Sequence, residues 1–237
     1  MKQFFYIITA LFLFVGLPAQ GQNRQIFQGT ISYNLQMSFN DYTMETKATC
    51  YYSDKHSKIS TDIYGVGIQV IRDFNLDSAT MLMNVMGKKI ALRIPNPQEN
   101  DTAEMNIGEL LSTDTLCGYI CQKYSIFHGS LTDSAISALP STPFTDLNIL
   151  KNTEVNMWAS VCQDLSVKNT LFSALPIPQN EAILQMCMEQ NNIKITITAT
   201  EVKAGKISNK EFQIDKSYQY TTLQKLQQML DSSNTMF

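Results

Sequence analysis

Hydrophobic and polar residues alternate strictly along the segment 27–39. The apolar side chains of this segment share one side and the polar ones share the other, with Ile31, Tyr33, Leu35, Met37 and Phe39 on the apolar side. A period of two is typical of a half-buried antiparallel strand. The next residues, 40–42, favour a turn, so the segment 43–53 is predicted to return as the second strand of a hairpin.

Similar short runs recur along the chain and predict further strands. They are separated by short polar turns, which favour an antiparallel meander. A Pro- and Asn-rich break covers 95–101, an irregular or amphipathic piece follows at 104–112, and a Ser-, Thr- and Pro-rich surface excursion covers 129–152. The predicted strands are 57–63, 67–73, 79–84, 88–94, 115–127, 154–160, 182–189 and 194–202.

Helical spacing is rare in this sequence. Residues 164–175 predict a short helix ended by Pro176, and residues 221–230 place Leu223, Leu226 and Leu230 on one helical face. The expected fold is mainly β: a single curved antiparallel sheet, an open half-barrel of about ten strands, with one or two helices packed on its concave face.

The N-terminus has the pattern of a cleavable secretory signal. Lys2 precedes an uncharged apolar stretch, and small residues stand at Ala19 and Gly21. The stretch is shorter than the ~20 residues that span a bilayer, and no second apolar run follows it. We therefore expect a signal peptide at 1–21 cleaved after Gly21, a single β-rich domain at 22–237, a periplasmic or secreted location, and no integral membrane span.

Charge excludes some partners. The chain has 18 basic and 21 acidic residues, and they are dispersed without a basic stripe. The electrostatic footprint of a nucleic-acid-binding protein is therefore missing. We expect no nucleic-acid partner.

Five cysteines raise the question of disulfides, since thiols can pair in an exported protein. Cys117 and Cys121 lie four residues apart. In a strand their Cα atoms would be ~13 Å apart, too far for a bridge between them. Bridges to neighbouring strands remain open, and the disulfide candidates are Cys121, Cys162 and Cys187.

Catalytic and metal-binding patterns are weak. The two histidines, His56 and His128, are isolated, and there is no H-E-x-x-H or G-x-S-x-G motif. The Gly65-Val66-Gly67 stretch precedes a predicted strand and not a helix, so it does not predict a phosphate loop. We expect no enzyme activity, no catalytic residues, no metal and no cofactor.

Twelve methionines are unusually many, and most lie in predicted strands. Their flexible thioether chains suit a surface that accepts variable apolar ligands, but ordinary core packing is the simpler explanation. Trp158 is open to the same two interpretations.

Several short segments resemble the domain-of-unknown-function 4412 family. The stretch 115–124, TLCGYICQKY, is similar to that family's "ILGYKCKKY"-like strand. The segment 154–165 resembles its "evWvt..dL" motif, and 212–218 its closing "F.iP.gY". Lys216-Ser217 replaces the usual Pro and Gly, and Cys117 is an additional cysteine.

That resemblance implies a fold similar to the outer-membrane lipoprotein carrier, an open half-barrel whose concave apolar face holds acyl chains. The implied function is an exported, non-enzymatic envelope protein that binds lipid or lipoprotein. The alternative is a protein-interaction or sensor module that uses the sheet edge or the 129–152 segment to bind envelope proteins. The expected ligand-lining residues are Tyr33, Leu35, Met37, Met81, Met83 and Trp158.

Overall fold

The computed structural model describes residues 26–63, 65–76, 78–85, 87–95, 108–130, 154–167, 181–222 and 224–226. The predicted signal peptide and most of the 129–152 excursion lie outside these residues.

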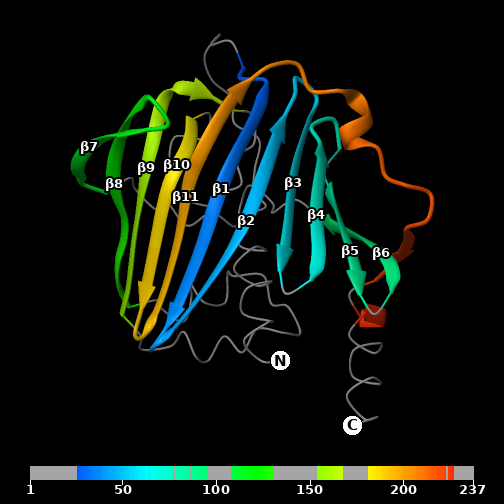
Figure 1. The fold of residues 1–237 in the computed structure, drawn as a ribbon, viewed down its shortest axis with the longest axis horizontal. Coiled ribbons are helices and arrows are strands. Elements are labelled where there is room, and N and C mark those ends of the chain that lie inside the picture. Colours follow the sequence, from blue (N-terminus) through cyan, green and yellow to red (C-terminus); the bar gives the residue numbers. More distant parts are fainter. Residues whose placement is uncertain are drawn as a thin grey trace.

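Twelve strands form one open sheet in this part of the chain (Figure 1). The strand order is β12-β6-β5-β4-β3-β2-β1-β11-β10-β9-β8-β7. All neighbours are antiparallel except β12, which runs parallel to β6. A mainly β fold with a single open sheet is thus confirmed, with twelve strands where about ten were expected. The strands are β1 (Gly29–Phe39), β2 (Tyr42–Tyr52), β3 (His56–Ile63), β4 (Val66–Asp73), β5 (Ser78–Val85), β6 (Lys88–Pro95), β7 (Leu110–Leu116), β8 (Tyr119–Ser130), β9 (Glu154–Ser166), β10 (Glu181–Gln190), β11 (Ile193–Ala204) and β12 (Gln219–Thr221).

The predicted strand 115–127 is divided between two strands, because a hairpin turn interrupts it at Cys117-Gly118. Both residues have positive φ, 51° and 83°, as a two-residue type I′ turn requires. Gly118 adopts this conformation without steric cost, and the alternation on either side hides the break. Cys117 therefore lies in the turn between β7 and β8, and Cys121 lies in β8.

The sheet has two faces with different roles. We call the face that carries Tyr33, Leu35 and Met37 the inner face. Two clusters of buried apolar residues lie on it, one over β1, β2 and β8–β11 and one over β3–β6, and Ile59 packs against both. The strict alternation of β1 therefore has the predicted meaning: its apolar side packs in the core.

One end of the sheet, the upper end in Figure 1, is closed by β9. The pairing of β9 with β10 jumps from Ala182↔Cys162 to Glu181↔Ser166, so β9 bends away from its neighbour there. The Phe27 N–H donates to the Ser166 carbonyl over 2.6 Å, which joins the end of β9 to the chain entering β1.

The chain after β11 forms a strap over the outer face of β3–β6. A 3-10 helix, η3 (Asn209–Phe212), begins at Ser208, whose side chain accepts from the Lys210 N–H. Phe212 is buried there against Ile71, Leu82 and Ala91. The strap then adds β12 beside β6 and turns onto the inner face.

The two predicted helices have different outcomes. Residues 164–166 belong to β9, because this segment continues the strand that closes the sheet, and the remainder of the predicted 164–175 helix lies largely outside the described residues. The C-terminal helix is present at 224–226, where Leu226 is buried against the β3–β6 cluster. Within the described chain this turn is the helical element on the inner face, while η3 lies on the outer one.

Candidate functional site

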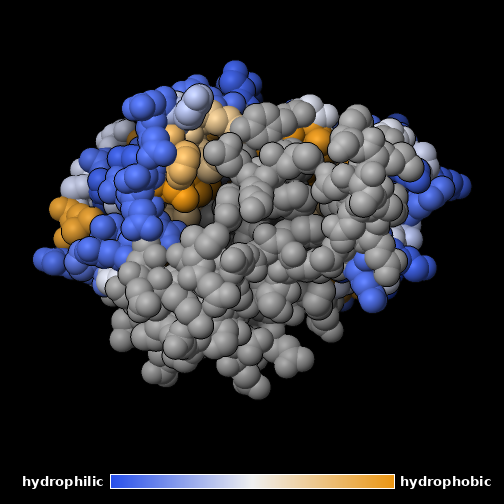
Figure 2. Space-filling view, turned by 90° about the horizontal axis from the view of Figure 1, so that it is seen from below, coloured by the Kyte–Doolittle hydropathy of each residue, from blue (hydrophilic) through white to orange (hydrophobic). Residues whose placement is uncertain are grey.

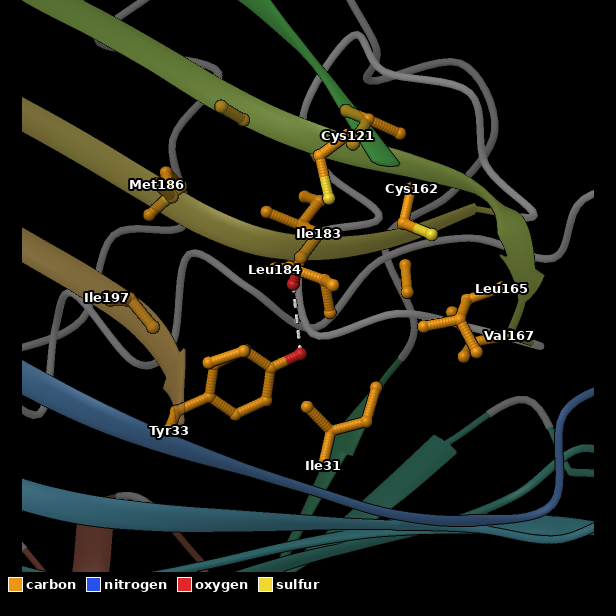
Figure 3. Packing of buried hydrophobic residues seen from close by; sticks show 14 of the residues in the cluster. Ile31, Tyr33, Cys121, Cys162, Leu165, Val167, Ile183, Leu184, Met186 and Ile197 are labelled. Carbon is orange, nitrogen blue, oxygen red and sulfur yellow. Dashed lines mark hydrogen bonds between the residues drawn. The ribbon is translucent and has the colours of Figure 1, made fainter. Parts of the chain in front are cut away.

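The inner face of β1, β2 and β8–β11 is filled at its upper end. There Ile31, Tyr33 and Cys50 are at most 2% exposed. They pack with Val161, Ile183 and Leu184 in one cluster (Figure 3). No ligand of useful size enters this end without displacing the chain's own side chains.

Lower on the same face, six side chains stand side by side on six strands. The register pairs Met44 with Met37, Met37 with Ile195, Ile195 with Met188, Met188 with Met157, and Met157 with Phe127. We call this set the methionine row: Met44, Met37, Ile195, Met188, Met157 and Phe127.

All six side chains of the methionine row are half-buried. The row directly above, from Leu35 to Ile197, Met186 and Ala159, is mostly buried. Below it, Phe39 is 37% exposed and Tyr42 is 80% exposed. Exposure therefore increases toward the lower end on β1 and β2, whereas Gln190 and Val155 in the same lower row are 8% and 3% exposed. Figure 2, which views this lower end, shows hydrophobic side chains next to the hydrophilic outer surface.

Tyr33 marks the boundary of the filled end. Its hydroxyl donates to the Ile183 carbonyl over 2.9 Å (Figure 3). The β9–β10 register shifts between Ile183 and Gln185, and the described β10–β11 pairing starts at Gln185. The Tyr33 hydroxyl therefore satisfies a carbonyl at a bulge, where the strand ladder is interrupted.

Two further polar groups lie beside Tyr33. The Tyr52 hydroxyl interacts with the Tyr33 hydroxyl and with the Cys50 thiol. Burial raises the pKa of Tyr33 and of Tyr52 well above the usual value. These groups stay neutral at ordinary pH and act as structural hydrogen-bonding groups.

The structure divides the expected lining residues into three sets. Leu35 and Met37 lie half-buried on the inner face, at and next to the methionine row. Tyr33, Met81 and Met83 are also on this face, but all are at most 4% exposed and belong to packed clusters.

Trp158 lies apart from the other five expected residues. It stands on the opposite, outer face, where it is paired with Cys187 and Ser125. The Lys123 ammonium lies 3.7 Å from its ring centroid. Because adjacent residues of a strand point to opposite faces, Trp158 is separated from its neighbour Met157 in the row.

Of the six row members, the expected lining residues included Met37 alone. Met44, Met188 and Met157 were missed although a signal was present, since they are methionines in predicted strands. Phe127 and Ile195 were missed without such a signal. What the sequence lacks is the register, which decides whether methionines on different strands meet.

The three disulfide candidates do not lie together. On β8 and β9 the last register pair is Gln122 with Val161, and Cys121 and Cys162 each lie one residue beyond it. Cys187 instead stands opposite Trp158 and Thr196. All five cysteines are free thiols in this structure.

The histidines take structural positions. The His56 ring stacks on Phe212 with centroids 5.1 Å apart, and its Nε2 lies 3.7 Å from Asp73. His128 is exposed on β8 and contacts Asn156. Among the described residues no three His, Cys, Asp or Glu side chains gather as a metal site would require. None of the described helices combines the length and apolarity needed to cross a membrane.

No protein-family model matches the chain, and no curated protein matches it. The resemblance to the domain-of-unknown-function 4412 family therefore stays a prediction. Solved structures do show similarity. PNGF-II is 12% identical at a TM-score of 0.45, over 85% of this chain and 32% of that chain. The present chain thus spans about a third of PNGF-II.

Two other similar structures come from bacteria. A chain of the Pseudomonas aeruginosa MucA/MucB complex is 8% identical at a TM-score of 0.45, over 93% of this chain and 63% of that chain. A putative outer membrane lipoprotein-sorting protein domain from Vibrio parahaemolyticus is 7% identical at a TM-score of 0.33, over 78% of this chain and 89% of that chain.

Proposed function

We propose that this protein is a non-enzymatic envelope protein that binds an acyl chain of a lipid or lipoprotein along the methionine row. The observation that carries the proposal is the row itself: six apolar side chains on six adjacent strands, all half-buried. Neighbouring strands lie ~4.8 Å apart, so the row extends over about 24 Å, the length of a long acyl chain.

Methionine suits this role physically. Its unbranched, polarisable side chain adapts its shape to an apolar ligand, whereas β-branched side chains present a fixed surface. The filled upper end borders one long side of the row, and the more exposed Phe39 and Tyr42 border the other side on β1 and β2. The proposed export to the periplasm or cell exterior would bring the protein to such ligands.

A fluorescent fatty acid titrated into the full mature chain tests the proposal. We expect saturable binding that the double variant M37Q/M188Q weakens. Two half-buried methionines contribute ~1 kcal/mol each, so the loss is roughly 30-fold in affinity. The matched control is L111Q, the same kind of apolar-to-Gln change at a side chain that is 51% exposed on the edge strand β7.

Wild-type protein that binds neither the probe nor any co-purifying lipid detected by native mass spectrometry refutes the proposal. So does a double variant that folds and binds as tightly as L111Q. Circular dichroism and thermal midpoints of all three proteins establish that the folds are comparable.

A second function, protein interaction through the sheet edge, is favoured by β7. This strand ends the described strand order, and Leu110 and Leu111 on it are 50% and 51% exposed. Exposed apolar edge strands accept an added strand from a partner. Capture of an envelope protein by wild type and M37Q/M188Q but not by L111K supports this function, whereas equal capture by all three refutes it.

A further inference from the structure

The cysteines on β8 and β9 form a site of their own at the closed end. Cys121 and Cys162 each lie one residue beyond Gln122↔Val161, the last register pair of β8 and β9 at this end. Residues that continue an antiparallel ladder by one step have Cα atoms ~4.5–5.5 Å apart, within the range that a disulfide spans. Both side chains are 0% exposed and belong to the same cluster, and Figure 3 shows both in the part of the cluster that contains Ile183.

We propose that Cys121 and Cys162 are an oxidisable dithiol that closes to a cross-strand disulfide, while Cys50, Cys117 and Cys187 remain thiols. The bridge would join β8 to β9 next to the point where β9 leaves β10 and crosses to Phe27. It would therefore fix the bend that closes the upper end of the sheet.

The positions of the three other cysteines exclude them from this bridge. Cys187 lies opposite Trp158, four residues along β9 from Cys162, which is ~13 Å in an extended strand. Cys50 is on β2, with β1, β11 and β10 between it and β9. Cys117 is exposed in the β7–β8 turn, and its thiol donates to the Ala199 carbonyl over 3.4 Å.

The surroundings favour Cys162 as the nucleophile. Its pKa is lowered because the Cys121 thiol donates to its sulfur and because the Asp164 and Leu165 N–H groups point at it. The pKa of Cys121 is raised because its thiol is the donor in the hydrogen bond with Cys162. The Tyr119 carbonyl oxygen, 3.6 Å from the Cys121 sulfur, is a second acceptor for this thiol. One thiolate beside one thiol is the state from which exchange begins.

The oxidant is a disulfide compound, either a small molecule or a protein of the oxidising compartment. The Cys162 thiolate attacks one sulfur of the oxidant, forms a mixed disulfide and releases one thiolate. Cys121 then loses its proton and attacks the Cys162 sulfur, which forms the bridge and releases the second thiolate. The two cysteines lose two protons and two electrons, and the oxidant is reduced to two thiols. Because both cysteines are fully buried, exchange takes place while the β8–β9 pair folds.

The test is refolding of the full mature chain from the reduced, denatured state with a mixture of reduced and oxidised glutathione. Remaining thiols are alkylated under denaturing conditions and the protein is digested with chymotrypsin. Trypsin is unsuitable because no Lys or Arg separates Cys117 from Cys121, whereas chymotrypsin cleaves at Tyr119 between them. We expect alkylation of three cysteines and one linked peptide pair that contains Cys121 and Cys162.

Variants separate this pairing from others. C121S and C162S should each lose the linked pair, and C50S, C117S and C187S should each keep it. Oxidised wild type should melt ~4–16 °C above the reduced protein, a difference that C121S and C162S lack. Alkylation of all five cysteines after oxidative refolding, or a main bridge through Cys50, Cys117 or Cys187, overturns the inference.

Discussion

Tyr33→Phe tests whether the filled end depends on one hydrogen bond. The variant keeps the aromatic ring, so it creates almost no cavity, and it removes only the hydroxyl. In the wild type that hydroxyl donates to the Ile183 carbonyl over 2.9 Å, at a position 2% exposed to solvent. The variant therefore leaves a buried carbonyl at the β10 bulge without its donor, and the Tyr52 hydroxyl without its neighbour.

An unsatisfied buried acceptor costs ~1–3 kcal/mol. For a protein of this length that corresponds to a fall in thermal midpoint of roughly 2–12 °C. Urea denaturation measures the effect directly: the midpoint should fall and the m-value should stay constant. Tyr42→Phe is the matched control, because Tyr42 is 80% exposed and its variant should lie within ~0.5 kcal/mol of wild type. Equal stability of the two variants refutes the assigned role of Tyr33.

Three further predictions concern the rest of the molecule. Stability should be full below pH ~10 and fall above it, because tyrosines of the unfolded chain ionise near ~10 while burial raises the pKa of Tyr33 and Tyr52 in the folded protein. Urea midpoints of wild type and Tyr33→Phe across this range measure the dependence of stability on pH. Limited peroxide oxidation should abolish binding of the acyl probe before the fold is lost, because the half-buried row methionines are oxidised before Met81 and Met83. M37L/M188L, which keeps Met44 and Met157, should lose binding more slowly than wild type. Unfolding that precedes the loss of binding contradicts this prediction. Phe212→Ala should lower the free energy of unfolding, measured in urea, by ~3–5 kcal/mol, because Phe212 is 7% exposed and packs on β4–β6. Tyr220→Ala is the control and should cost under ~1 kcal/mol, because Tyr220 is 58% exposed. Similar costs would show that Phe212 does not anchor the strap.

Alternation in the sequence predicted most strands, because each strand buries one face and the period of two survives in the residue pattern. Alternation failed to show a strand boundary where the turn between two strands kept the period of two. The turn at Cys117-Gly118 is two residues long, so alternation continues across it and one hairpin resembles one strand. The end of β9 was missed for the opposite reason: Asp164 and Ser166 belong to a bent strand whose partner is the chain before β1.

The site was less predictable than the fold, because it depends on register. Parity within β1 correctly grouped Tyr33, Leu35 and Met37, but nothing in the sequence relates that parity to Trp158, which stands on the other face. Burial of Met81 and Met83 also depends on a distant element, since Leu226 packs in their cluster. Composition indicates many methionines in strands, and only the pairing shows which of them form a row.

The bulges explain why one end of the inner face is filled and the other is not. Register shifts occur between Ser32 and Tyr33, between Ile183 and Gln185, and between Glu181 and Ala182, all toward the upper end. Bulges bend a strand and increase its twist, and here they let β9 cross the end of the sheet. Below these shifts, β2, β1, β11, β10 and β9 pair without interruption, so their side chains form regular rows. On β8 a further shift between Ser125 and Phe127 adjoins the row. Irregular pairing thus closes one end of the sheet, and regular pairing below it produces an apolar row suited to an elongated ligand.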